Sequence, residues 1–205
     1  MQGYVLNVTK VRDEDLIVTI LSENFTHTAY RFYGARHSNI NVGYKIDFEL
    51  EINIKSTIPR LKDVIQLNFP WLLDAKKLYL WQVYIKLFYH HLKDTEELDE
   101  FYIQLLDDLV IKMTKQNPKR AILESYVKLC EYEGRLHDDF TCLLCDLPID
   151  NNISLVRGFL ATHSSCSYSK NFELNKITEF FNEKTLIAFN EEEVDYLWDV
   201  MLQGL

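Results

Sequence analysis

Four side chains suited to metal binding lie close together in the C-terminal half of the sequence. Cys142 and Cys145 form a Cys-x-x-Cys pair, and His163 and Cys166 form a His-x-x-Cys pair after an intervening loop. Two such pairs suit tetrahedral zinc, because three thiolates and one imidazole fill its coordination shell without leaving an open position. The spacing therefore predicts one structural zinc per chain. The alternative is a set of reduced cysteines that merely lie near each other in a loop.

The residues around these pairs argue against two catalytic uses of the cysteines. A zinc deaminase needs His-x-Glu and Pro-Cys-x-x-Cys, whereas His137 is followed by two aspartates and Cys142 is preceded by Phe-Thr. A thioredoxin-like redox pair would begin a helix within a βαβ unit, and the surrounding pattern predicts no such unit. The remaining cysteine, Cys130, lies on the apolar face of a predicted helix, so we interpret it as a core thiol.

The motifs of common enzyme classes are also missing from the sequence. It contains no glycine-rich phosphate loop, no Gly-x-Ser-x-Gly and no His-Glu-x-x-His. We therefore expect a protein that is not an enzyme and that has no small-molecule substrate.

Basic residues form two groups that could contact the phosphates of nucleic acid. The first is interleaved with the aromatic residues Tyr30, Phe32 and Tyr33 and with His37, and cations beside stacking aromatics are typical of single-strand binding on a small barrel. The alternatives are solvated surface charges for the first group and partners of a helix macrodipole for part of the second. The predicted DNA-binding residues are Lys10, Arg12, Arg31, Tyr33, Arg36 and Lys45 in the first group and Lys112, Lys115, Lys119 and Arg120 in the second.

The first 69 residues predict a small barrel. Apolar and polar residues alternate strictly from Val42 to Ile54, which is the pattern of a strand with one buried face. Turn-forming residues separate this strand from its neighbours, and closing the sheet into a barrel removes exposed edges. The four other predicted strands are Tyr4–Val8, Asp15–Leu21, Thr26–Gly34 and Ile58–Phe69.

The sequence becomes helical from Pro70 onward. An apolar segment over Leu72–Leu92 predicts a central buried helix, and Asp94 with Glu97 predicts a capping box at the start of the next helix. Asn117-Pro118 predicts the beginning of a third helix that ends at Gly134. A last helix is expected after Asn190, with Val194, Leu197, Trp198, Met201 and Leu202 buried. The predicted class is thus α+β, with a barrel over residues 1–69 and a helical domain over residues 70–205 that carries the zinc loop at about 140–168.

The charge distribution differs between these two parts. The chain has 205 residues and a net charge of −9, with 47% hydrophobic and 26% charged residues. Residues 1–70 hold 8 basic and 8 acidic residues, so the whole excess of negative charge lies in residues 71–205. We expect the helical domain to repel DNA except near Lys112–Arg120 and to act mainly as a protein-docking surface. Without a signal peptide or an apolar span, the protein is expected in the cytoplasm, away from membranes.

Several segments resemble the bacterial RecO family of DNA-repair proteins. Gly3–Leu6 with Thr9–Leu21 resembles the start of that family, and Tyr33–Ser38 resembles its Gly-Ala-Arg segment. Ser125–Gly134 through Cys145 is similar to its helix and zinc loop, and Gly158–Cys166 is similar to the returning half of that loop. The family's full zinc site has a cysteine where this chain has His163.

This resemblance implies an N-terminal OB-fold, a helical domain with zinc, and a role as a recombination mediator. Such a protein binds single- and double-stranded DNA, anneals complementary strands, and works with RecR to load RecA onto DNA coated with single-strand-binding protein (SSB). The resemblance also implies association with the nucleoid during repair. The alternative is a non-catalytic scaffold whose barrel binds proteins and does not contact DNA directly.

Overall fold

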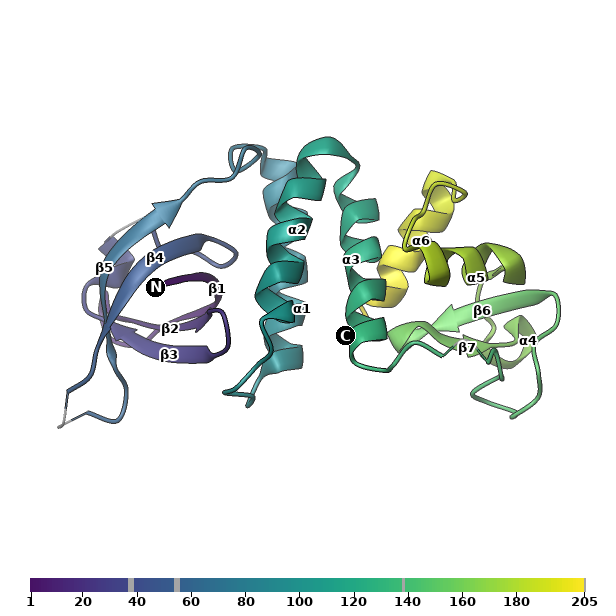
Figure 1. Ribbon diagram of the computed structural model, residues 1–205, viewed down its shortest axis with the longest axis horizontal. Coiled ribbons are helices and arrows are strands. Elements are labelled where there is room, and N and C mark those ends of the chain that lie inside the picture. Colours follow the sequence, from purple (N-terminus) through teal and green to yellow (C-terminus); the bar gives the residue numbers. More distant parts are fainter. Residues whose placement is uncertain (37–38, 54–55, 138, 205) are drawn as a thin grey trace. The chain divides into compact units, whose positions relative to one another are not determined.

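The computed structural model describes residues 1–36, 39–53, 56–137 and 139–204. The chain forms two compact units, Met1–Thr114 and Lys115–Leu205 (Figure 1). The change from strands to helices falls near residue 70, as the periodicity predicts, and the first two helices belong to the same compact unit as the strands. In the part of the chain that the structure describes, no helix has both the length and the apolar character needed to cross a bilayer.

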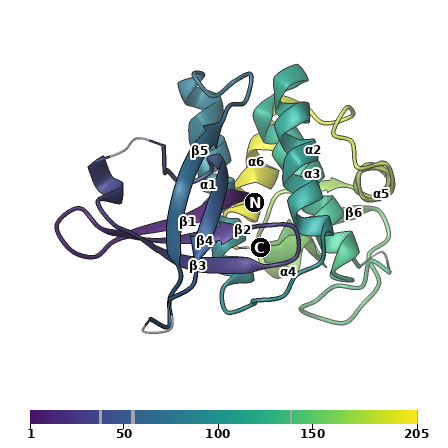
Figure 2. The same cartoon turned by 60° about the vertical axis from the view of Figure 1, so that its left-hand side comes forward.

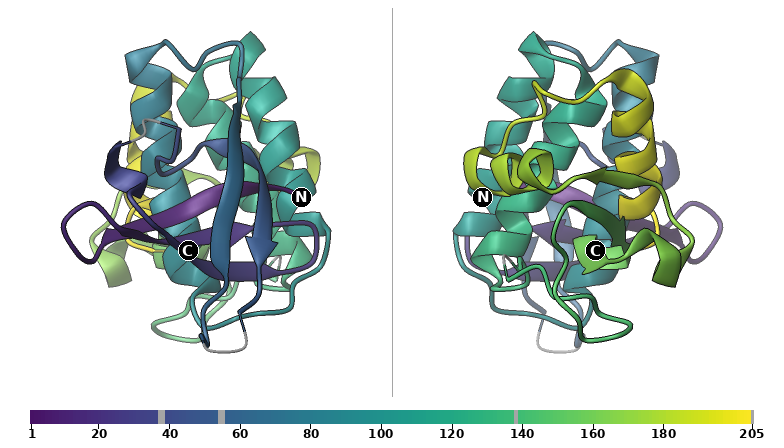
Figure 3. Two further views of the ribbon diagram at one scale, coloured as in Figure 1. Left: turned by 90° about the vertical axis from the view of Figure 1, so that its left-hand side faces the viewer. Right: turned by 90° about the vertical axis from the view of Figure 1, so that its right-hand side faces the viewer.

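Five strands of the first unit close into a barrel in the order β1-β2-β3-β5-β4, and Figure 3 looks at this barrel in its left panel. Neighbouring strands are antiparallel except β3 and β5, which run parallel where Tyr30 pairs with Arg60. This is the topology of an OB-fold, and it confirms the predicted fold class. The strands are β1 (Gln2–Lys10), β2 (Leu16–Leu21), β3 (Thr26–Arg31), β4 (Lys45–Glu51) and β5 (Arg60–Leu67).

The observed β5 is shorter than the strand expected over Ile58–Phe69, and two other predicted strands continue into segments that are loops in the structure. The strand expected over Val42–Ile54 is confined to β4, and Ile52 beyond it is 86% exposed; Ile54 lies outside the described residues. The strand expected over Thr26–Gly34 ends at Arg31, because Tyr33 adopts a positive φ of 52° and Gly34–Arg36 form a short 3₁₀ turn. Both strands therefore end where the chain enters a loop at the rim of the barrel.

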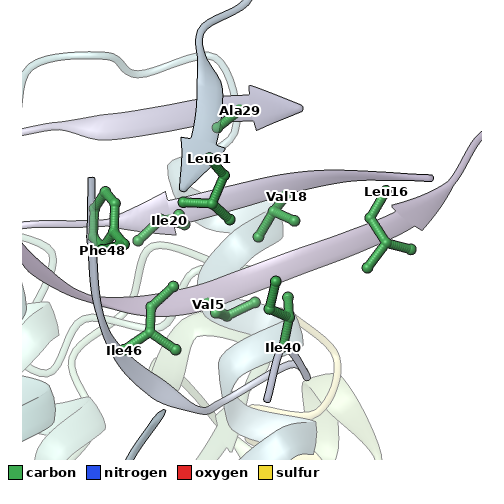
Figure 4. Close-up of a cluster of buried hydrophobic side chains, with 9 residues drawn as sticks. All are labelled: Val5, Leu16, Val18, Ile20, Ala29, Ile40, Ile46, Phe48 and Leu61. Atoms are coloured by element: carbon green, nitrogen blue, oxygen red, sulfur yellow. The ribbon is translucent and has the colours of Figure 1, made fainter. Parts of the chain in front are cut away.

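The barrel encloses a hydrophobic core (Figure 4). Alternate residues of each strand point inward, as the period-2 pattern requires, and the outward residues remain available for other contacts. The buried cluster consists of Val5, Leu16, Val18, Ile20, Ala29, Ile40, Ile46, Phe48 and Leu61.

Helix α1 (Ala75–Leu92) is joined to the barrel by an indole hydrogen bond. Asp74 caps the helix by accepting from two backbone amides of its first turn. Trp81 lies fully buried on the inner face of the helix, and its Nε1 donates to the carbonyl of Gly43 at 2.7 Å. Gly43 has a φ of 85°, and a Cβ at this position would lie 2.6 Å from Trp81 Nε1, so both its conformation and its lack of a side chain are needed there.

Helix α2 (Phe101–Lys115) begins later than the sequence predicts. The expected capping box at Asp94 is wrong, because Asp94 has a positive φ of 71° and the residues after it run as an extended segment along the β2–β3 turn. Thr26 N donates to the carbonyl of Glu96 at 2.9 Å, which holds this segment in place. Asp99 provides the actual cap by accepting from Phe101 N at 2.8 Å.

The second unit combines helices with a small sheet, and the right panel of Figure 3 faces it. Helix α3 begins after the N-cap Asn117, and Gly134 follows its end with a φ of 65°, as predicted. Asn190 and Glu193 form a complete capping box at the start of α6, whose predicted apolar face is buried except for Leu202, which is 39% exposed. The elements are α3 (Pro118–Tyr132), β6 (Asn152–Val156), β7 (Leu160–Thr162), α4 (Ser164–Ser167), β8 (Asn171–Glu173), α5 (Leu174–Glu183) and α6 (Glu191–Met201).

Candidate metal centre and candidate nucleic-acid interface

The four predicted metal ligands come together in the second unit. Cys142 and Cys145 lie in a turn whose flanks pair at Thr141 and Pro148. The other two follow β7, where His163 precedes helix α4 and Cys166 lies within it. The turn is tied to β7 by a hydrogen bond from Leu143 N to the carbonyl of Ala161 at 2.9 Å.

The donor atoms have the separations of a tetrahedral site. All four lie within 4.8 Å of one another. His163 Nδ1 is 3.4 Å from Cys145 Sγ and 3.9 Å from Cys166 Sγ. Bonds of about 2.0–2.3 Å to a tetrahedral zinc place neighbouring ligand atoms roughly 3.5–3.8 Å apart. The described residues therefore form a group that can bind one metal ion, and its composition of three thiols and one imidazole is consistent with zinc.

Hydrogen bonds around the cluster favour the tautomer of His163 and the ionised form of Cys142 that bind a metal. His163 Nε2 lies 3.1 Å from the carbonyl oxygen of Pro148. Because a carbonyl can only accept, Nε2 carries the proton and Nδ1 presents its lone pair to the cysteines, which is the usual arrangement behind a metal-binding histidine. Burial would raise the pKa of Cys142, but donation from the backbone amides of His163, Leu144 and Cys145 lowers the pKa of this thiol to about 6 and favours the thiolate that zinc binds.

The fourth cysteine, Cys130, differs from the three cysteines of the cluster in its surroundings. Cys130 is fully buried on α3, as predicted for a core thiol. Burial raises the pKa of its thiol, which keeps it protonated and unreactive.

A second feature is a hollow of about 600 Å³ on the outer surface of the barrel. It lies over the outward-facing residues of β2 and β3, between the β1–β2 loop, which projects from the barrel in Figure 2, and the β4–β5 loop. OB-folds bind oligonucleotides at this place, on the face of strands 2 and 3 between the same two loops. The hollow is lined by Val11, Arg12, Ile17, Tyr30, Phe32, Glu51, Asn53, Ser56, Ile58 and Arg60.

Two aromatic rings and an arginine form one wall of this hollow. The Tyr30 and Phe32 rings meet edge to face with their centres 4.8 Å apart, and the Arg60 guanidinium lies 4.6 Å from the centre of the Phe32 ring. Tyr30 is fixed because its hydroxyl donates to Asp15 at 2.6 Å. That hydrogen bond, with a second one from the backbone amide of Tyr33, lowers the pKa of Asp15. The wall thus offers flat apolar faces next to a cation.

One acidic side chain lies among the cations at the edge of the hollow. Glu51 accepts from Lys62 at 2.5 Å and lies 3.9 Å from Arg60. The hydrogen bond from Lys62 lowers the pKa of Glu51, against an opposing effect of desolvation. Glu51 is therefore charged at neutral pH and competes with any other anion for Arg60.

The structure brings only some of the predicted barrel contacts into this hollow. Arg12 lines it, and Lys10 is exposed at the end of β1. Arg31 donates to the carbonyl of Leu61 at 2.9 Å and lines a different hollow with Lys62. Lys45 pairs with Asp107 at 2.6 Å and lies over the Tyr4 ring.

The Gly-Ala-Arg segment forms a small cluster of its own. Tyr33 is 57% exposed, and the Arg36 guanidinium lies 4.9 Å from the centre of its ring. Arg36 also pairs with Glu14. His37, which follows in the sequence, lies outside the described residues.

Two of the four cations in the second predicted group form ion pairs within the second unit. Lys119 pairs with Asp195 at 2.8 Å. Arg120 pairs with Glu191 at 2.6 Å and donates to two main-chain carbonyls of the segment before α6. Lys112 is half-buried on α2 and Lys115 is exposed at its end. Whether any residue of either group contacts DNA stays a prediction.

The sequence interpretation did not select Arg60. This residue begins β5 and is distant in sequence from the aromatic segment, so only the parallel pairing of β3 with β5 places it beside Phe32. The topology of an OB-fold, in which strand 5 follows strand 3 around the barrel, is the signal that could have identified it.

Together, the closed barrel with its aromatic hollow and the Cys₃His cluster define an OB-fold protein whose metal donor set is consistent with a structural zinc, because the chain supplies all four ligands. Residues 1–72 match the family described as RecO N terminal. This match supports a protein of the RecO family. A search of curated proteins finds no match.

Proposed function

We propose that this protein is a DNA-repair and recombination mediator whose barrel binds single- and double-stranded DNA at the hollow between the β1–β2 and β4–β5 loops. The observation that carries the proposal is the wall formed by Tyr30, Phe32 and Arg60, with Arg12 on the β1–β2 loop. Aromatic faces stack on bases of any sequence, and guanidinium groups neutralise phosphates. The match of residues 1–72 to the RecO family supports the same role.

The family role extends this proposal to strand annealing and to protein partners. We propose that the protein anneals complementary strands and, with RecR, helps RecA replace SSB on single-stranded DNA, in the cytoplasm. Contacts to phosphates rather than base edges favour annealing, because they neutralise both strands without selecting a sequence. This role is that of a mediator and requires no catalytic residue.

The proposed part of the metal is structural. Cys142, Cys145, His163 and Cys166 would hold a single zinc, which would cross-link the turn before β6 to the segment after β7. Because all four positions are taken by the protein, no position remains for a substrate. The chain's own contribution is the orientation of His163 by Pro148 and of Cys142 by backbone amides.

Binding of the full chain to labelled oligonucleotides over a range of salt concentrations tests the proposed function. We expect binding to single strands and duplexes of unrelated sequence, with log affinity falling linearly with log salt by about 0.7–0.9 per phosphate contact. Annealing of complementary strands should lose rate over the same salt range. Absence of binding at low salt, in a folded sample, would instead favour the scaffold alternative.

A further inference from the structure

The turn that carries Cys142 and Cys145 exposes three leucines. Leu143, Leu144 and Leu147 are 53%, 57% and 60% exposed, respectively. Single exposed leucines are ordinary on protein surfaces, but three within five consecutive residues form a concentrated apolar feature. We refer to these three residues as the leucine turn.

The leucine turn is held open by its own hydrogen bonds and by the metal cluster. Cys142 N donates to the carbonyl of Leu147, and Asp146 N donates to the carbonyl of Cys142, both at 2.9 Å. Cys142 is fully buried beneath the turn, and its thiol belongs to the metal-binding group. The leucine side chains therefore cannot fold inward without displacing the metal-binding group.

The other half of the metal cluster adds an aromatic residue. Tyr168 lies two residues after Cys166, at the end of α4, and is 94% exposed. Its positive φ of 55° places it in the left-handed region, which ends the helix there. Large apolar side chains thus flank both halves of the donor set.

The formal charges of the segment that carries the leucine turn have one sign. The sequence contains no lysine or arginine from residue 136 to residue 156. Asp139, Asp146 and Asp150 lie in this stretch and are exposed. An apolar feature edged by carboxylates complements an apolar surface edged by lysine or arginine, and it repels the phosphates of DNA and of anionic membranes.

We propose that the leucine turn docks onto an amphipathic helix of a partner protein, whose apolar face is edged by lysine or arginine. The apolar face packs on Leu143, Leu144 and Leu147, and the flanking cations approach the aspartates. This surface belongs to the second unit, so the proposal is independent of the hollow on the barrel and of DNA binding.

A designed peptide tests this proposal with the full-length, metal-loaded protein. The probe is a fluorescent amphipathic helix of leucine and lysine, and its matched controls are a leucine–glutamate helix and a scrambled leucine–lysine peptide of the same composition. We expect the probe to bind at least about tenfold more tightly than either control. Asp146→Asn/Asp150→Asn should weaken the probe severalfold, because it removes the charges that face the lysines.

Leucine substitutions separate docking from simple charge attraction. Leu144→Ser/Leu147→Ser should weaken binding of the probe at least about tenfold, because the peptide can no longer bury these two apolar side chains. Ile187→Ser is the matched control, since Ile187 is 88% exposed outside the turn, and it should bind like the wild type. The exposed positions tolerate serine, and bound metal with circular dichroism checks that the variants fold.

Two results would overturn the proposal. One is equal binding of the probe to the wild type and to L144S/L147S, which would mean that net charge alone attracts the peptide. The other is self-association of the wild type that is lost in L144S/L147S, together with no discrimination between the probe and its controls. That outcome would identify a second copy of this chain as the occupant.

Discussion

The guanidinium of Arg60 lies 4.6 Å from the centre of the Phe32 ring, although the two residues lie on different sides of β4 in the sequence. Closure of the barrel creates this contact, because β5 lies between β3 and β4 in the sheet and so pairs with β3 as well as with β4. The Phe32 ring limits the positions that the guanidinium can adopt. The part of the ring that the guanidinium does not cover therefore lies next to a positive charge. A base and its phosphate need these two neighbours at once.

We expect Phe32→Ala to weaken single-strand binding more than duplex binding. Stacking of a base on an aromatic ring contributes about 1–3 kcal/mol, which corresponds to roughly a fivefold to 150-fold loss of affinity. The bases of a duplex are already stacked, so less is lost there. Fluorescence anisotropy with both DNA forms measures the difference, and Tyr79→Ala, which removes a 65% exposed aromatic outside the hollow, is the control. Equal losses for both variants would argue against stacking at Phe32.

Glu51→Gln should tighten binding to DNA. The carboxylate lies 3.9 Å from Arg60 and repels the phosphates that Arg60 would contact. Removing this charge lowers the repulsion of the phosphates and frees Arg60, so we expect a severalfold gain in affinity at low salt. Glu49→Gln removes an exposed charge from the same strand and serves as the control. If the two variants gained equally, the effect would come from net charge and not from the hollow.

Metal analysis of purified protein should find one zinc per chain, and removing the metal should destabilise the second unit. Cys145→Ala and His163→Ala should both lose zinc, whereas His163→Cys should retain it because the donor set remains tetrahedral. Cys130→Ala, a substitution of the buried cysteine on α3, should keep the metal. Thermal unfolding with and without chelator reports the stabilisation. A metal-free protein that keeps the wild-type melting temperature would contradict a structural role.

The stability of the barrel should fall on mild acidification because of His27. Burial lowers the pKa of this imidazole, which lies 6.0 Å from the ring centre of Phe25 and 6.3 Å from that of Phe48. The imidazole of the unfolded chain therefore binds a proton more readily than that of the folded chain. The contribution of neutral His27 to the free energy of unfolding is complete above about pH 6.5 and is lost as pH falls below that value. Denaturant titrations at about pH 7.5 and 5.5 should show a smaller pH effect for His27→Gln than for the wild type, with exposed His90→Gln as the control.

The barrel and the metal ligands were predictable because their sequence signals are local. Alternation around β4 shows one buried face, and the spacing of Cys142, Cys145, His163 and Cys166 reflects the geometry of a tetrahedral ion. The caps at Asn117 and Asn190 are local as well, since each accepts from an amide two or three residues ahead.

Other features depend on contacts that the local pattern does not contain. Asp94 has the residues of a capping box, but the chain there pairs with the β2–β3 turn instead, so tertiary hydrogen bonds override the local preference. Strands β7 and β8 have three residues each, which is too short for periodicity to appear. Arg60 enters the hollow only through the order of strands around the barrel.

Two arginine pairs provide the most direct test of DNA binding at the hollow. Arg12 and Arg60 line it, whereas Arg31 donates to the carbonyl of Leu61 and Arg36 pairs with Glu14. The variants R12A/R60A and R31A/R36A remove the same formal charge, so a difference between them reports position rather than net charge. Both are compared with the wild type by oligonucleotide binding over a range of salt concentrations.

We predict that R12A/R60A weakens binding to all sequences alike and lowers the slope of log affinity against log salt by about 0.7–0.9 per lost contact. The slope and affinity of R31A/R36A should lie closer to those of the wild type. A folded R12A/R60A variant that keeps the affinity and the salt slope of the wild type would contradict DNA binding at the hollow.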